Sequence, residues 1–231
     1  ALLGRTNSYG EGNSDFWLVK TDSEGILDWN KTIGDAGDER GRFLVNTVDG
    51  GFLLLGWTNS SGAGGIDFWL VKTDSYGNSQ WNKTYGGANW DEARCVVQTN
   101  DGGYGICGMT ASYGAGSNDF WLVKTDMFGN MQWNQTYGGA GDDWAYSLIQ
   151  TSDGGYAIAG GTESFGVGVD FWLIKTNSFG DTLWTRTFGG SSTDWGTSVQ
   201  QTMDGGYAAV GYTSSYGNGN SDFWLIKTDS L

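Results

Sequence analysis

The chain has 231 residues, 26 of them acidic and 12 basic, and a net charge of −14. Nucleic acids and anionic membranes are bound through clustered Lys and Arg, so this balance argues against both as partners. The sequence contains no His, which removes the commonest general base and with it every Ser-His-Asp or Cys-His site. No apolar run approaches the ~20 residues of a membrane helix, so we expect no membrane insertion.

One stretch of eight residues, Asp-Phe-Trp-Leu-Val-Lys-Thr-Asp, recurs along the chain with small changes. Its copies begin at Asp15, Asp67, Asp119, Asp170 and Asp222, at intervals of 52, 52, 51 and 52 residues. A fixed period near 50 residues is typical of a solenoid or propeller built from one duplicated supersecondary unit. We therefore expect a single repeat domain over residues 1–231.

The repeat over residues 93–139 shows the elements expected of one unit. Short β-branched or aromatic segments alternate with Gly-, Asn- and Asp-rich turns, which is the pattern of antiparallel hairpins. The predicted strands are 95–99 (strand A), 104–110 (strand B), 119–125 (strand C) and 131–137 (strand D), joined by a hairpin turn at 100–103, a loop at 111–118, a turn at 126–130 and a loop at 138–144.

Strand C is apolar on both faces, with Phe120 and Leu122 on one and Trp121 and Val123 on the other. Such a strand must be covered on both sides. Radially stacked four-stranded sheets provide this cover, so the predicted fold is an all-β propeller of four-stranded antiparallel blades. A β-helix is the alternative, although its repeats are shorter.

Several motifs of the unit resemble one known family. They are Trp-Asn-Lys-Thr-Tyr-Gly-Gly at 81–87, Asp91, Thr-Asn-Asp-Gly-Gly-Tyr at 99–104, Gly-Met-Thr at 108–110 and Asp-Phe-Trp-Leu-Val-Lys at 119–124. Together they resemble the β-propeller repeat family of bacterial and archaeal secreted and cell-surface proteins, and the resemblance covers the whole chain. It implies that strand A is innermost, that strand D is outermost, and that the protein is extracellular or on the cell surface.

Strands B and C occur five times, whereas strands A and D occur four times. The first expectation is therefore a five-bladed ring whose first and last blades are incomplete. Two alternatives stay open: a segment of a longer protein, or a dimer or filament in which another copy completes the ends. An unpaired strand edge recruits such partners.

Carboxylates recur at two places in the unit. One set opens strand C (Asp15, Asp67, Asp119, Asp170, Asp222), and the other precedes strand A (Glu39, Asp91, Asp143, Asp194). Since both loops leave the same end of the blades, the first set is a candidate ring of Ca²⁺ ligands, the only cofactor considered. The alternative is that each Asp fixes its loop by accepting backbone N–H bonds.

A lysine recurs late in strand C and is expected to form a structural ion pair within each blade (Lys20, Lys72, Lys124, Lys175, Lys227). Five copies of one catalytic group make little mechanistic sense, so we expect no enzyme. The non-repeated polar residues Arg40, Arg42, Arg94 and Glu163 show no pattern in the sequence.

Aromatic residues recur in the predicted loops. Trp90, Trp144 and Trp195 fall between strands D and A, and Tyr113 and Tyr216 fall between strands B and C. Exposed rings beside carboxylates and amides stack on sugars, which predicts a multivalent lectin as the alternative function. The simpler interpretation is that these rings fill gaps between blades.

Asn-x-Ser/Thr occurs at Asn30, Asn82 and Asn134 on strand D and at Asn59 in a loop. These are candidate glycosylation sites on the outer rim, unless duplication copied an inert tripeptide. Cys95 and Cys107 lie on neighbouring strands of one hairpin, and whether they pair depends on the register.

These patterns predict a non-catalytic extracellular or cell-surface scaffold, glycosylated and self-assembling through its incomplete terminal blades. The expected partners are other surface proteins, copies of the chain or glycans.

Overall fold

The computed structural model describes residues 1–230, which form strands and connecting loops without a helix. The strands are β1 (Leu2–Thr6), β2 (Asp15–Thr21), β3 (Leu27–Ile33), β4 (Glu39–Asn46), β5 (Phe52–Thr58), β6 (Asp67–Thr73), β7 (Ser79–Tyr85), β8 (Asp91–Gln98), β9 (Tyr104–Thr110), β10 (Asp119–Thr125), β11 (Met131–Tyr137), β12 (Asp143–Gln150), β13 (Tyr156–Thr162), β14 (Asp170–Thr176), β15 (Thr182–Phe188), β16 (Asp194–Gln201), β17 (Tyr207–Thr213) and β18 (Asp222–Thr228). Nothing in the described part of the chain is a helix that could cross a membrane.

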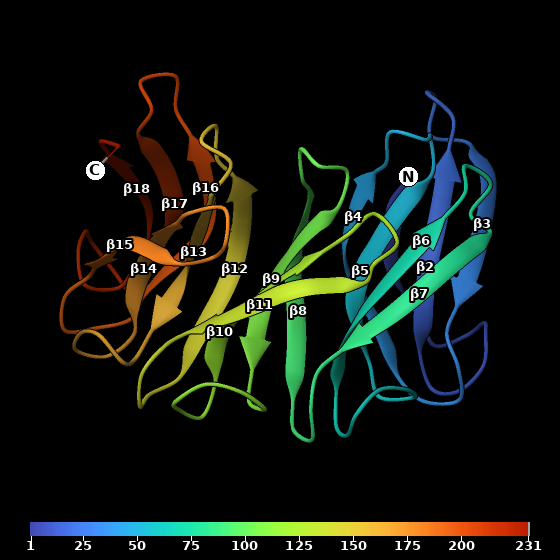
Figure 1. Cartoon of the computed structure of the whole chain (residues 1–231), viewed down its shortest axis with the longest axis horizontal. Helices are drawn as coiled ribbons and strands as arrows, with labels where there is room; N and C mark the ends of the chain where they lie inside the picture. Colours follow the sequence, from blue (N-terminus) through green and yellow to red (C-terminus); the bar gives the residue numbers. More distant parts are fainter. Residues whose placement is uncertain (231) are drawn as a thin grey trace.

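The strands form five antiparallel sheets in chain order (Figure 1). The first sheet is β1-β2-β3, the second β4 to β7, the third β8 to β11, the fourth β12 to β15 and the fifth β16-β17-β18. The expected all-β, propeller-like arrangement of repeated sheets is thus confirmed. The bounds of β9, β10 and β11 coincide with the predicted strands B, C and D.

Strand A begins four residues earlier than predicted, because β8 starts at Asp91 and not at Cys95. The predicted loop over residues 138–144 is accordingly too long, since β12 begins at Asp143. The cause is a β-bulge between Ala93 and Cys95, which recurs in every strand A. A bulge inserts an unpaired residue, so the alternation that marks a strand is broken at this point.

The core lies between adjacent sheets. Phe120, Trp121, Leu122 and Val123 of β10 are all at most 1% exposed, which confirms that this strand is covered on both faces. Across each junction a Phe ring of one sheet packs on a Trp ring of the next, as Phe68 does on Trp121 at 4.8 Å. Burying one such side chain stabilises the fold by about 1.5–3 kcal/mol.

The strands β4, β8, β12 and β16, called the inner strands below, form one edge of their sheets and pack against each other from sheet to sheet. No comparable packing joins the first and fifth sheets within residues 1–230, and Figure 1 shows these sheets at opposite ends of the molecule. The structure therefore does not confirm that the five sheets close into a ring.

The repeated lysine forms the ion pair expected within each sheet. The Lys72 Nζ lies 2.8 Å from Asp49 Oδ2, in the turn between strands A and B, and 2.7 Å from the Thr73 carbonyl oxygen. The first sheet lacks this turn, and there Lys20 pairs with Asp28 at 2.9 Å. The equivalent pairs are Lys124–Asp101, Lys175–Asp153 and Lys227–Asp204.

The two cysteines face each other across β8 and β9, since Cys95 and Cys107 are direct partners in the register. Both are buried and present as free thiols.

Candidate functional site

The two sets of recurring carboxylates meet at the junctions between sheets. Asp67 Oδ1 and Asp91 Oδ2 both lie beside Gly86. A Cβ added to this glycine would collide with Asp67 Oδ1 and would lie 2.8 Å from Asp91 Oδ2. Each carboxylate also fixes its own loop, because Asp67 Oδ2 accepts the Ala63 N–H and Asp91 Oδ2 accepts the Gly87 N–H, both at 2.8 Å. The same arrangement surrounds Gly34, Gly138 and Gly189. The carboxylates thus form separate buried pairs and not one continuous ring.

These pairs hold like charges away from water. Burial raises the pKa of Asp67 above its usual 3.8, the Ala63 amide partly offsets this, and the charge on Asp91 raises it further. Asp67 Oδ1 is buried and has no hydrogen-bond partner. The pKa values of Asp15, Asp119 and Asp170 are raised in the same direction, again chiefly by burial.

The predicted Ca²⁺ ligands occupy these junctions, except that Asp222 has no following sheet and is partly exposed. Within residues 1–230 no group of three or more Asp, Glu or Cys gathers to hold a metal ion. Each junction therefore offers a buried carboxylate pair, an arrangement that can share a proton.

The Asn of each candidate glycosylation site on strand D is exposed and has a structural role. Asn134 Oδ1 accepts a hydrogen bond from Trp121 Nε1 at 3.0 Å, and the pairs Asn30–Trp17 and Asn82–Trp69 repeat it. Asn59, in its loop, accepts the Asp38 N–H at 2.7 Å. The repeated Asn is explained by these contacts without a glycan, whose attachment stays a prediction.

The loop tyrosines fill gaps, as the simpler interpretation expects. The Tyr113 ring packs on Trp121 at 5.3 Å, and its hydroxyl donates to the Gly86 carbonyl oxygen at 2.9 Å. Tyr216 repeats both contacts in the fifth sheet, and both rings stay about half exposed, so their role in sugar stacking stays a prediction. Trp90 is half exposed and borders an open cavity of about 740 Å³.

Trp144 and Trp195 lie on the inner strands β12 and β16 and not in the predicted loops. Their rings are 5.0 Å apart. The prediction for Trp144 and Trp195 is wrong because strand A begins four residues earlier than its sequence pattern indicates.

The inner strands contain several positions where the repeat breaks down, and the second and fourth differ most in charge and aromatic character. The first, third and sixth residues of these strands are alike in all four copies, being acidic, small and aliphatic. The second residues are Arg40, Glu92, Trp144 and Trp195, and the fourth are Arg42, Arg94, Tyr146 and Thr197. Aligning the four strands from their acidic first residue would have revealed this set from the sequence.

The fourth residue is the one that the bulge displaces. The opposing strand supplies a glycine, such as Gly108 in β9, and a Cβ there would collide with the Glu92 carbonyl oxygen. The glycine thus permits the close approach that the bulge requires. Bulges re-aim side chains, and this one directs the fourth residue of every inner strand alike.

A chain of contacts links six of these eight side chains across four sheets, all but Arg40 and Thr197. Glu92, whose side chain is 5% exposed, pairs with Arg42 at 2.6 Å and Arg94 at 3.2 Å. The Arg94 guanidinium lies over the Tyr146 ring at 5.1 Å, and that ring meets Trp195 edge-on at 5.4 Å. The inner strands therefore carry one connected set of polar and aromatic groups.

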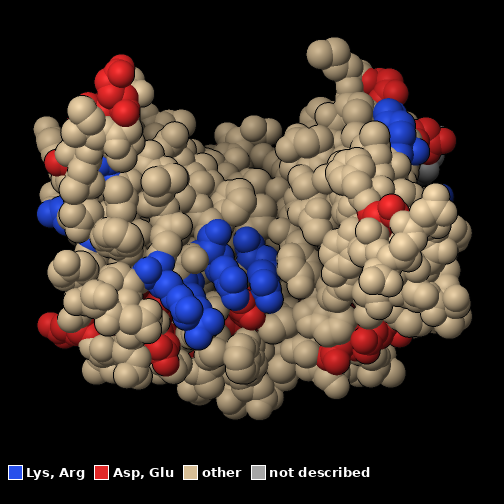
Figure 2. Space-filling view, turned by 180° about the vertical axis from the view of Figure 1, so that it is seen from behind, with Lys and Arg blue, Asp and Glu red and all other residues tan. Residues whose placement is uncertain are grey.

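A cavity of about 500 Å³ lies among the inner strands and shares Tyr146 with this set. Its walls include Phe43, Val45, Gln98, Thr197 and Gln200. Figure 2 shows basic side chains gathered near the centre of one face of the molecule, with most acidic groups toward the edges.

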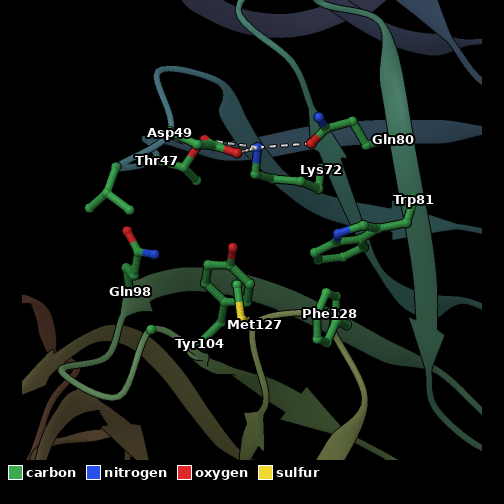
Figure 3. A pocket seen from close by; sticks show the side chains of 11 residues that line it. Thr47, Asp49, Lys72, Gln80, Trp81, Gln98, Tyr104, Met127 and Phe128 are labelled. Atoms are coloured by element: carbon green, nitrogen blue, oxygen red, sulfur yellow. Dashed lines mark hydrogen bonds and ion pairs between the residues drawn. The ribbon is translucent and has the colours of Figure 1, made fainter.

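A second kind of cavity, of about 310 Å³, lies between the second and third sheets. Figure 3 shows the Lys72–Asp49 ion pair and Gln80 at one side and Trp81, Tyr104 and Phe128 at the other. A related cavity of about 520 Å³ between the fourth and fifth sheets is lined by Asp153, Lys175, Trp184 and Tyr207.

No family model and no curated protein matches the chain. A solved protein of unknown function from Bacteroides caccae superposes with a TM-score of 0.54 at 11% identity, over 94% of this chain and 71% of that one. Sqt1 from Chaetomium thermophilum and a β-1,2-mannobiose phosphorylase from Listeria innocua each reach 0.46, at 12% and 13% identity, over 85% and 94% of this chain and 50% and 67% of theirs. The first similarity supports the propeller-like fold and nothing about activity.

Proposed function

We propose that the protein is a non-catalytic extracellular or cell-surface scaffold that assembles end to end through its two terminal sheets. One observation carries the proposal. The last sheet exposes the face that, on every earlier sheet, is covered by the next sheet of the chain. Phe171 and Leu173 of β14 are fully buried, whereas their equivalents Phe223 and Leu225 of β18 are 75% and 60% exposed.

The first sheet presents the complementary surface. Trp17 of β2 is 37% exposed, whereas its equivalents Trp69 and Trp121 are 4% and 1% exposed. Inside the chain these two surfaces meet at every junction, as in the contact of Phe16 with Trp69 at 4.7 Å. The Phe223 face of one copy therefore fits the Trp17 face of the next.

Such a contact joins two different surfaces and is heterologous, so it builds rings or filaments. The open edges of β1 and β18 favour the same arrangement, because unpaired strand edges accept further strands. A second copy is thus the occupant that best matches the exposed faces.

Sedimentation velocity over a range of protein concentrations tests the proposal. We expect oligomers that grow with concentration, and monomers for Phe223→Lys. Phe179→Lys is the matched control, because Phe179 is 70% exposed in a turn away from this face. A wild-type protein that stays monomeric, or a Phe179→Lys variant that dissociates equally, overturns the proposal.

We also propose that the five sheets are the blades of a propeller of the surface-protein repeat family. We further propose that the protein carries glycans at four exposed residues, Asn30, Asn59, Asn82 and Asn134. The intact mass of the native protein tests the glycans, since the bare chain weighs 24.9 kDa. A mass equal to that of the bare chain rejects them.

The second candidate function is multivalent sugar binding, favoured by the cavity of Figure 3. It combines the Trp81 ring with carboxylate, amide and ammonium groups, the set that saccharide recognition uses, and it recurs at another junction. Quenching of Trp fluorescence by neutral sugars, lost in Gln80→Ala, supports this function. An unchanged spectrum across a sugar array rejects it.

A further inference from the structure

We propose that the inner strands of the second to fifth sheets form a single site for an acidic saccharide, one that carries carboxylates on its sugar rings. This site is distinct from the terminal faces and from the repeated cavities at the junctions. It is built from the second and fourth residues of the inner strands, where the repeat breaks down.

The first step is that the fold does not explain these residues. Four copies of one strand need the same packing, and the first, third and sixth positions obey this. The second and fourth positions instead hold Arg40 and Arg42 on β4, Glu92 and Arg94 on β8, and mostly aromatic rings on β12 and β16. Side chains that differ at structurally equivalent positions are not determined by the shared fold.

The second step is charge. Four of the five arginines of this acidic chain lie on β1, β4 and β8, namely Arg5, Arg40, Arg42 and Arg94. Arg5 of β1 is equivalent to Trp57 of β5, because each is the register partner of the strand C Phe. Trp57 is in turn the register partner of Arg40 on β4. Glu92 neutralises only one of these charges, so the four arginines keep a positive excess over their one acidic partner in the described part of the chain.

Arg40 lacks an acidic partner within the described residues. Its guanidinium lies over the Trp57 ring at 5.0 Å, and its Nε is buried without a hydrogen-bond partner. No ion pair involves Arg5 or Arg40 among residues 1–230, although every repeated lysine has one. A planar guanidinium with unused N–H groups binds a carboxylate through two parallel hydrogen bonds.

The third step is the aromatic half of the site. Tyr146, Trp144 and Trp195 cluster on β12 and β16. The apolar face of a sugar ring stacks on such rings. Thr197, Gln98 and Gln200 around the adjoining cavity supply donors and acceptors for hydroxyl groups.

Arg42 and Arg94 are connected to the aromatic half through Glu92 and Tyr146, so the surface suits an extended ligand that bears both carboxylates and flat apolar faces. An acidic peptide satisfies the arginines but leaves the aromatic half unused. A neutral sugar stacks on the aromatic half but leaves the arginines without a partner. An acidic saccharide uses both halves, and it is therefore the occupant that the surface fits.

Isothermal titration calorimetry with an oligosaccharide of galacturonic acid tests the proposal, with its methyl ester and poly-glutamate as comparison ligands. We expect binding of the acid and about tenfold weaker binding of the ester, which lacks the charges for the guanidinium forks. Poly-glutamate should bind more weakly than the acidic sugar.

Variants locate the site. Arg40→Gln should weaken binding of the acidic sugar by about tenfold, since it removes one charge-assisted pair. Arg186→Gln is the matched control, because Arg186 is exposed on the outer strand β15, and it should bind like wild type. Tyr146→Ala should weaken binding of the sugar but not of poly-glutamate.

Three results would overturn the proposal: no binding of the acidic sugar at millimolar concentration, equal binding of the ester, or equal loss in Arg186→Gln. Preferred binding of poly-glutamate would assign the surface to acidic peptides instead. Because Phe223→Lys leaves the inner strands untouched, measuring sugar binding in that variant separates this site from end-to-end assembly.

Discussion

At the scale of single residues, a tryptophan of strand C shows what one missing acceptor does. Trp17, Trp69 and Trp121 each donate the indole N–H to an Asn on the neighbouring strand. In the fourth sheet that Asn is replaced by Thr185, and Trp172 Nε1 is buried without a partner. A buried donor without an acceptor is costly, so this junction is less stable than its copies.

Thr185→Asn should therefore stabilise the protein by about 1 kcal/mol, because it restores the acceptor. Asn134→Ala, which creates the same defect in the third sheet, should cost about 1–2 kcal/mol. Urea unfolding of both variants, made in a host that does not glycosylate proteins, measures the two changes. A loss of stability in Thr185→Asn would contradict the explanation.

At the scale of elements, the buried carboxylate pairs give each junction a dependence on pH. The pKa of Asp67 is raised in the folded state, so its contribution is fully present below the usual 3.8 and is lost as the pH rises through the raised value. Asp67→Asn removes the charge, and its amide can donate to Asp91 Oδ2. The variant should gain about 1 kcal/mol at neutral pH and nothing below pH 3.8.

Urea unfolding of Asp67→Asn at a series of pH values checks this. Asp222→Asn is the matched control, since Asp222 opens a strand that no further sheet covers. An equal effect of both substitutions, or a loss at neutral pH, would show that the pair is stabilised by a bound cation or another contact. Adding Ca²⁺ to the wild-type protein distinguishes these two cases.

The elements also show what could be predicted from the sequence. Strands B to D follow from their short β-branched or aromatic segments and from the turns that flank them, where Gly102, for example, has a φ of +82°. The start of strand A could not be predicted this way, because the bulge at Arg94 breaks the alternation and makes the segment resemble a loop. The connected set on the inner strands could not be predicted this way for the same reason, so Arg40, Arg42 and Arg94 show no pattern in the sequence.

At the scale of the whole molecule, the sheets form an arc whose internal members are covered on both faces and whose end members are covered on one. Ring closure could not be predicted, since the repeat encodes each junction locally and says nothing about the angle summed over five sheets. In arrays of this kind stability is close to a sum of intrinsic and nearest-neighbour terms. The end sheets, which lack one neighbour each, should therefore open first.

Hydrogen exchange tests this at two protein concentrations. In dilute protein the amides of β17 and β18 should exchange faster than those of β9 and β10, because Phe223 and Leu225 lie open to solvent while Phe120 and Leu122 are buried. At high concentration the Trp17 face of a second copy covers β18, so its exchange should slow while that of β10 stays the same. In Phe223→Lys the rates should not depend on concentration. Uniform exchange along the chain would mean that the five sheets unfold as one unit, and concentration-independent exchange in the wild type would exclude end-to-end assembly.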